Sequence, residues 1–279
     1  MSETAVSVIR VLAACSCAVM VLSPSILMYR IFKQKDVGAA SVIPLVALFV
    51  NCHAWSVYGY MTHDWVPIFW IYFPGEAVAI VFLSVYWKCT THRRYVTRVL
   101  LVALALLALF SSYAVVGGLG YTNQSQEGVH AVIGAIADVC AMCMYAAPME
   151  KLLQVLKYKS AAFLNSHMVI AGLTNNCLWC AYGILTANWF IIAPAIVFTT
   201  LNSFTLVLCV LYDPKTHPLP DDFHRQQTTS NGPPALASES TSKMSAISHK
   251  AESTAPSPAF EAILSPLTSI HVAKETAWS

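Results

Sequence analysis

Seven long runs of apolar residues alternate with short polar segments along the first 212 residues of the chain. A helix that crosses a membrane needs about 20 predominantly apolar residues, and each run comes close to that length. After Asp213 the pattern stops, and a segment rich in Ser, Thr, Pro and Ala follows, which predicts a disordered tail at 213–279. The pattern therefore predicts spans at 5–29, 42–60, 66–87, 99–120, 129–149, 164–185 and 189–212.

The composition points to the same class of protein. Hydrophobic residues make up 57% of the chain, charged residues make up 11%, and the mean hydropathy is +0.59. Such values exclude an ordinary soluble domain and predict an all-α protein embedded in a lipid bilayer. The net charge of only +2 gives no basic surface for a nucleic acid. No nucleophile is paired with a base, and Cys177 and Cys180, although spaced as CxxC, lack the second ligand pair that a zinc site needs. We therefore expect no enzyme, no cofactor and no metal site.

Among the loops that join the spans, only alternate ones contain basic residues. They follow the first, third and fifth spans, whereas the loops at 61–65, 121–128 and 186–188 contain no Lys or Arg. Because cytoplasmic loops carry the excess of basic residues, the N-terminus is predicted outside and the tail in the cytoplasm. Asn123 begins an Asn-Gln-Ser triplet in a predicted outer loop, so we expect it to be an N-glycosylation acceptor.

Two stretches of the chain match each other without a gap, shifted by 124 residues (148 − 24). We call this shift the repeat offset. An internal repeat in a membrane protein indicates a transporter whose substrate lies between two related halves. Since both halves keep their basic loops on the same side, the Leu-, Ala- and Val-rich span at 99–120 must invert the chain between them. The matched pairs are Pro24 with Pro148, Lys33 with Lys157, Lys35 with Lys159, Trp55 with Trp179, Tyr58-Gly59 with Tyr182-Gly183, and Trp65 with Trp189.

Several short motifs accompany the repeat. They include Leu22-Ser23-Pro24-Ser25, Ile43-Pro44, Met144-Tyr145-Ala146-Ala147-Pro148-Met149, and Trp179 three residues before Tyr182-Gly183. With them, residues 5–212 resemble the SWEET sugar transporters, the MtN3/saliva family of the PQ-loop superfamily. The resemblance implies seven transmembrane helices as two parallel triple-helix bundles (3+1+3), at 5–98 and 121–212, joined by an inverter helix at 99–120.

The resemblance also implies a function. A SWEET-like carrier is a uniporter that moves mono- or disaccharides in both directions by alternating access, without an ion gradient. Its partners are a small uncharged sugar and the lipid bilayer. We expect a multi-pass protein of the plasma membrane, with the Golgi and the vacuole as alternatives. The sequence leaves open which sugar is carried and whether the chain forms a homo-oligomer.

The sugar site implied by the resemblance departs from the family pattern. Trp179 matches a tryptophan that stacks on the sugar, and Trp55 is its partner in the first half. The two asparagines that usually bind the sugar fall at Tyr72 and Ala195, and the alanine side chain cannot form a hydrogen bond.

Four other polar residues lie near the tryptophans. Asn51 and Asn175 occupy equivalent repeat positions, so we expect them to pair with each other. Asn176 and His53 are then the candidate sugar ligands, because polar groups at membrane depth tend to face the protein interior.

The resemblance assigns two gates. Pro24, Pro44 and Pro148 match hinge prolines near the inner gate, and the fourth hinge position is occupied by Asn165. The alternative for these residues is that proline is merely tolerated in membrane helices.

Tyr58 and Tyr182 match outer-gate tyrosines, with Asp64 and Asn188 at the loop positions that would bind them. The alternative for the tyrosines is an aromatic belt at the membrane surface.

Glu76 and Asp138 keep a second function open. They are the carboxylates clearly inside predicted spans, and a proton-coupled PQ-loop carrier of amino acids or another small solute would use such a group. A hydrogen bond between helices is the other interpretation of both. A retinal-binding receptor is disfavoured because the seventh span contains no lysine. A partner-binding protein that has lost transport stays open because the two asparagines are missing.

Overall fold

A computed structural model of the protein describes residues 3–38 and 40–217, and the regular structure within them is helical. Of the predicted tail at 213–279, the part from residue 218 onward lies outside the described residues. The helices are α1 (Glu3–Leu22), α2 (Ser25–Gln34), α3 (Ile43–Met61), α4 (Trp70–Cys89), α5 (Arg93–Gly118), α6 (Gln126–Tyr158), α7 (Ser166–Thr186) and α8 (Trp189–Leu211), with short turns η1 (Trp65–Phe69) and η2 (Ala161–Phe163).

Each predicted span coincides with a helix, and six helical segments of the described chain are long and apolar enough to cross a membrane. The remaining predicted span, 42–60, is α3, which has 19 residues and contains Asn51 and His53. These two polar side chains lower its hydropathy, so α3 depends on its neighbours for burial. Two helices also extend beyond the predicted limits: α5 starts at Arg93 and α6 continues to Tyr158, because their ends carry basic residues past the apolar stretch.

The first span is interrupted where the sequence has Ser23-Pro24. The chain forms α1 up to Leu22 and starts α2 at Ser25, because proline has no N–H to donate and its ring collides with the preceding turn. In the second repeat, α6 continues through Pro148 without a break. The equivalent prolines therefore produce a helix break in one half and are tolerated inside a helix in the other.

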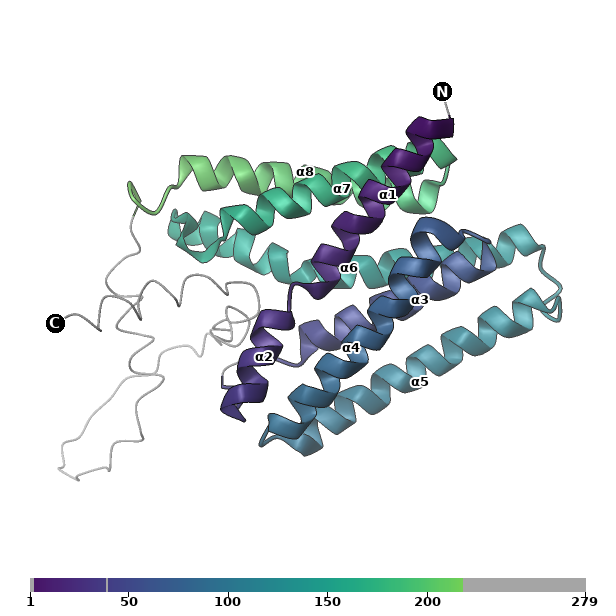
Figure 1. Cartoon of the computed structure of the whole chain (residues 1–279), viewed down its shortest axis with the longest axis horizontal. Coiled ribbons are helices and arrows are strands. Elements are labelled where there is room, and N and C mark those ends of the chain that lie inside the picture. The colour runs from purple at the N-terminus through teal and green to yellow at the C-terminus, as the bar shows by residue number, and fades with distance from the viewer. Residues whose placement is uncertain (1–2, 39, 218–279) are drawn as a thin grey trace, which may run out of the picture.

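The repeat is visible in the packing of the helices (Figure 1). By the repeat offset, α1 and α2 correspond to α6, α3 to α7, and α4 to α8. Within the halves, α3 packs on α4 and α7 packs on α8. Between the halves, α1 packs on α7 and α6 packs on α3, which are equivalent contacts. The intervening helix α5 packs on α3 and α6, along one edge of the molecule in Figure 1. The division into 3+1+3 stays a prediction.

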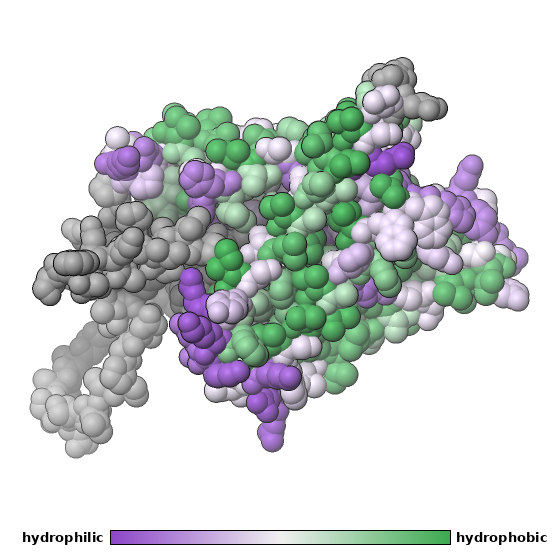
Figure 2. All heavy atoms as spheres, in the orientation of Figure 1, coloured by the Kyte–Doolittle hydropathy of each residue, from purple (hydrophilic) through white to green (hydrophobic). Residues whose placement is uncertain are grey.

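The surface agrees with a membrane environment. Figure 2 shows hydrophobic residues across the middle of the visible face and hydrophilic residues gathered toward its ends. On α5, large side chains such as Leu106 and Leu109 are exposed. Exposed apolar surface of this extent is unfavourable in water and is normally covered, here by the acyl chains of the bilayer.

The Tyr-Gly motif of each half allows a close helix contact. A Cβ atom on Gly59 would lie 2.8 Å from the Ile68 side chain and from the Phe69 backbone nitrogen. A Cβ atom on Gly183 would lie 2.9 Å from the side chain of Ile192. Because only glycine leaves this space free, the helix that follows each tyrosine can return tightly against its neighbour. The two tyrosines are thereby held at the same end of the molecule.

Candidate functional site

A cavity of about 610 Å³ lies between the two halves of the protein. Helices α1, α3, α4, α6, α7 and α8 all contribute side chains to its wall. The structure thus brings together every predicted sugar-binding residue except His53. Those that line the cavity are Asn51, Trp55, Tyr72, Asn175, Asn176, Trp179 and Ala195.

Stacked aromatic rings close one end of the cavity. The rings of Trp55 and Tyr72 are stacked with their centroids 5.9 Å apart, and Tyr72 lies 6.1 Å from Trp179. Each tryptophan also meets, edge to face, the tyrosine three residues later: Tyr58 at 5.5 Å and Tyr182 at 5.9 Å. Only 6% of Trp55 and 8% of Trp179 is exposed. The ring of Tyr72 therefore fills the space between the tryptophans, where the resemblance places an asparagine.

Beyond this aromatic layer lie the four predicted outer-gate residues, joined as two pairs that we call the outer latch. Tyr182 Oη donates a hydrogen bond to Asp64 Oδ2 at 2.6 Å. Tyr58 Oη donates to Asn188 Oδ1 at 3.0 Å, and Asn188 Nδ2 lies 2.8 Å from the same hydroxyl. Each pair connects a helix of one repeat to the loop of the other, and the repeat offset relates the pairs. The predicted gate partners are therefore in contact, and the cavity is separated from this end of the molecule.

The sequence analysis missed a fifth residue at the latch, Arg10. Burial raises the pKa of Asp64, while the hydrogen bond from Tyr182 and the positive charge of Arg10 oppose that increase. Arg10 is the only charged residue of the predicted span 5–29, and a charge inside a span is a functional signal that could have identified it.

The four predicted hinge positions, Pro24, Pro44, Pro148 and Asn165, line the opposite end of the cavity. The charged residues among those lining the cavity, Glu150 and Lys151, follow Pro148 closely in the chain. The side chain of Asn165 caps α7, because it accepts a hydrogen bond from the backbone N–H of His167 at 3.1 Å. A polar N-cap thus stands where the resemblance places a hinge proline.

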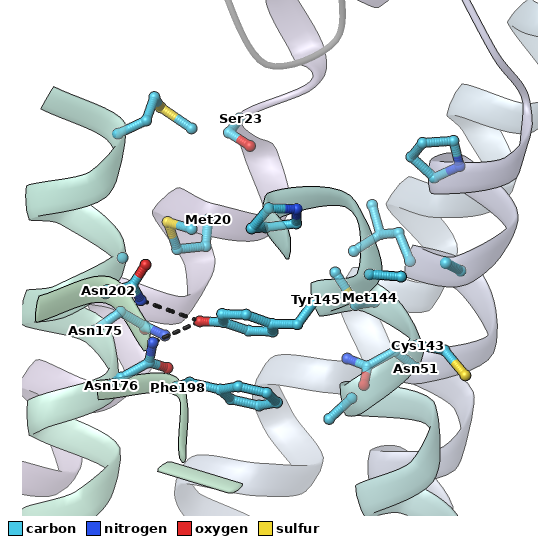
Figure 3. A pocket seen from close by; sticks show the side chains of 18 of the residues that line it. Met20, Ser23, Asn51, Cys143, Met144, Tyr145, Asn175, Asn176, Phe198 and Asn202 are labelled. Atoms are coloured by element: carbon cyan, nitrogen blue, oxygen red, sulfur yellow. Dashed lines mark hydrogen bonds between the residues drawn. The ribbon is translucent and has the colours of Figure 1, made fainter. Parts of the chain in front are cut away.

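A group of hydrogen-bonded polar residues lies in the cavity wall (Figure 3). Asn176 Nδ2 donates to Tyr145 Oη at 2.5 Å, and Asn202 Nδ2 approaches the same oxygen at 3.4 Å. The Tyr145 ring stacks on Phe198 with an interplanar angle of 2°. We call Tyr145, Asn176 and Asn202 the polar cluster. Of these, only Asn176 was predicted as a ligand, although Tyr145 lies in a family motif and Asn202 is a polar residue inside an apolar span.

The predicted pairing of Asn51 with Asn175 is wrong. Asn175 Oδ1 instead accepts a hydrogen bond from Ser16 Oγ at 2.9 Å, which joins α7 to α1. The repeat equivalent of Ser16 is Cys140, and a thiol is a much weaker donor than a hydroxyl. Asn51 accordingly has a buried Oδ1 with no hydrogen-bond partner among the described residues, and it lines the cavity.

His53 is not placed as predicted. Its Nδ1 lies 2.9 Å from Glu76 Oε1 and its Nε2 lies 2.8 Å from Ser111 Oγ, so it connects α3, α4 and α5 outside the cavity. Glu76 is thereby engaged between helices rather than facing the cavity. Asp138 does not line the cavity either, and its Oδ1 is buried without a hydrogen-bond partner within the described chain.

Asn123 is exposed in the loop between α5 and α6. This location is accessible to a modifying enzyme, and its glycosylation stays a prediction.

The chain is similar to known proteins in both sequence and fold. A family model described as "Sugar efflux transporter for intercellular exchange" matches residues 7–94 and 131–217, which are the two repeats without most of α5. The "Sugar transporter SWEET1" of Drosophila pseudoobscura pseudoobscura is 26% identical over 78% of this chain and 94% of that protein. The "Bidirectional sugar transporter SWEET3b" of Oryza sativa subsp. japonica is 28% identical over 72% of this chain and 80% of that protein.

A solved structure of a eukaryotic SWEET transporter aligns with a TM-score of 0.63 at 17% sequence identity. The alignment covers 74% of this chain and 98% of that one. The agreement confirms the membrane-protein fold expected from the sequence.

The latch should respond to pH through Asp64. Because burial raises the pKa of this carboxyl group when the latch is closed, closure favours its protonated form. The closed latch should therefore be most stable below the ordinary pKa of an aspartate. It should lose stability, by at most about tenfold per pH unit, as pH rises from that value through the raised pKa, and should not change further above it.

Hydrogen exchange of residues 61–69, corrected for intrinsic exchange rates, measures this opening. The substitution Asp64→Asn gives the pair the neutral chemistry of Tyr58 and Asn188, so its exchange should no longer depend on pH. The loop at 119–125, which lies outside the latch, serves as the control segment. Equal pH dependence of exchange in the wild type and in Asp64→Asn would contradict the assignment of this pH response to Asp64.

Proposed function

Since the chain belongs to the family of sugar efflux transporters for intercellular exchange (MtN3/saliva, or SWEET), we propose that it is a facilitative transporter that moves sugars in both directions across a membrane. This is a family of transporters and not of enzymes. The observation that carries the proposal is the cavity between the two repeats, which offers tryptophan faces and neutral amide groups to a solute. Such a lining suits an uncharged molecule with apolar C–H faces and many hydroxyl groups.

The transport cycle we propose is alternating access. The outer latch is closed, whereas the cavity extends toward the hinge positions at the other end. With the predicted orientation this is an inward-facing state. Rocking of the repeats about Pro24, Pro44 and Pro148 would break the two latch pairs and close the hinge end, so that the cavity opens to the outside.

The membrane and the orientation belong to the same proposal. Basic residues end α2 and α6 at equivalent repeat positions, with Lys35 and Lys159 as the capping residues. They support an N-terminus outside and a C-terminus in the cytoplasm. We propose the plasma membrane as its location.

The proton-coupled alternative is less well supported. A coupling carboxylate has to meet the solute path, yet neither Glu76 nor Asp138 lines the cavity. The Glu76 carboxylate lies within hydrogen-bond distance of the His53 ring on α3. This contact favours a bond between helices over a role in the solute path. We therefore favour facilitated diffusion.

Flux measurements in liposomes that contain the purified protein test the function directly. Radiolabelled hexose or sucrose should equilibrate across the membrane without accumulating, whether or not a pH gradient is present. Accumulation that follows the pH gradient and is lost in Glu76→Gln would replace the proposal with the proton-coupled carrier. Absence of flux for every sugar would also refute it.

Trp179→Ala tests the stacking role. The substitution removes a ring that meets both Tyr72 and Tyr182, so sugar flux should fall at least about tenfold at equal amounts of folded protein. Trp189→Ala is the matched control, because this tryptophan lies in the same repeat, is 73% exposed and does not line the cavity. Flux in Trp179→Ala equal to that of the control would refute the stacking role.

A further inference from the structure

The aromatic end of the cavity offers few hydrogen bonds to a sugar. Ala195 has only a methyl group, and the ring of Tyr72 is held between Trp55 and Trp179. A sugar needs donors and acceptors for its hydroxyl groups, because leaving them unpaired in a partly dehydrated cavity costs free energy. The hydrogen-bonding groups must therefore lie elsewhere along the same cavity.

Asn202 is placed to supply them. It follows Ala195 by seven residues on α8, which is two helical turns, so both side chains lie on the same helix face about 10 Å apart along the axis. Both residues line the cavity. The Asn202 amide lies against Gly172 of α7, where a Cβ atom would be 3.4 Å from Nδ2, an ordinary van der Waals distance. The amide is thus packed between the two helices.

The polar cluster is held in place and keeps unused hydrogen-bonding capacity. The stack of Tyr145 on Phe198 fixes the ring, and its hydroxyl oxygen receives N–H groups from Asn176 and Asn202. Among the hydrogen bonds of the described residues, the Oδ1 atoms of both amides and the Tyr145 hydroxyl proton have no further partner. These groups can accept from and donate to the hydroxyls of a sugar.

The polar cluster belongs to one repeat only. By the repeat offset, Tyr145, Asn176 and Asn202 correspond to Val21, Cys52 and Val78, and none of these three carries a hydroxyl or amide group. Val21 lines the cavity on the first repeat. A solute in the cavity therefore meets hydrogen-bonding groups of the cluster on α6, α7 and α8 and an apolar valine on α1.

We propose that Tyr145, Asn176 and Asn202 form the hydroxyl-binding site of this transporter, two helical turns from Ala195 and carried by the second repeat alone. The inference rests on the proposed function and assigns it an uncharged polyhydroxyl ligand. The sugar would stay bound to the second repeat while the first repeat moves past it. Asn202 is the specificity-determining residue of this site.

Half-saturation constants for hexose flux in liposomes test the site, with a series of hexoses that each lack one hydroxyl group. Asn202→Leu should raise the constant about fivefold, which corresponds to the loss of one neutral hydrogen bond. The wild type should also bind one deoxyhexose less well than the parent sugar, and Asn202→Leu should no longer distinguish those two sugars. A purely structural role for Asn202 would not remove this discrimination.

Two further variants keep the test decisive. Thr200→Val is the control, since this hydroxyl lies on the same helix, does not line the cavity and donates to Ile196 O at 2.9 Å, and its half-saturation constant should not change. Tyr145→Phe keeps the stack on Phe198, removes only the hydroxyl, and should weaken binding even if Asn202→Leu does not fold.

The outcomes separate the two proposals. A wild-type protein that moves no sugar refutes the proposed function. A wild type that moves sugar, together with Tyr145→Phe and Asn202→Leu variants that keep its half-saturation constant and its discrimination, overturns only the hydroxyl-binding site.

Discussion

A polar side chain inside a bilayer has to find its hydrogen-bond partner within the protein or in a cavity that admits water or solute. Three groups of polar residues satisfy this constraint in different ways. One group joins the repeats at the outer latch. A second, His53 with Glu76 and Ser111, joins α5 to the first repeat. The third lines the cavity and keeps hydrogen-bonding capacity for a ligand.

The same constraint explains how the carrier can change state. The latch consists of two hydrogen-bonded pairs, and each such bond contributes only about 1–3 kcal/mol. Breaking them is within the range that new contacts at the hinge end and a bound sugar can offset. The helix break at Pro24 and the kink-permitting Pro148 lie at the end where those new contacts would form. Closing the hinge end can therefore compensate energetically for opening the outer latch.

The spans, the repeat and seven cavity-lining residues among the eight predicted to bind sugar could be found from the sequence, because hydropathy and a constant offset can be recognised without knowledge of packing. The sequence did not predict which face of a helix each polar residue occupies. His53 and Asn51 lie two positions apart on α3, yet only Asn51 lines the cavity. Arg10 and Asn202 were missed for a related reason: the equivalent positions in the other repeat are Gly134 and Val78, so no matching polar residue indicates the role of either.

Distances between the repeats at both ends of the molecule test alternating access most directly. Spin labels on bioorthogonal residues, which spare the nine native cysteines, can report Thr62 to Thr186 at the latch end and Lys35 to Lys159 at the hinge end. Adding a transported sugar should populate a state in which the latch distance increases while the hinge distance decreases. Distances that stay unchanged, or that increase together, would contradict a rocking motion of the repeats around the cavity.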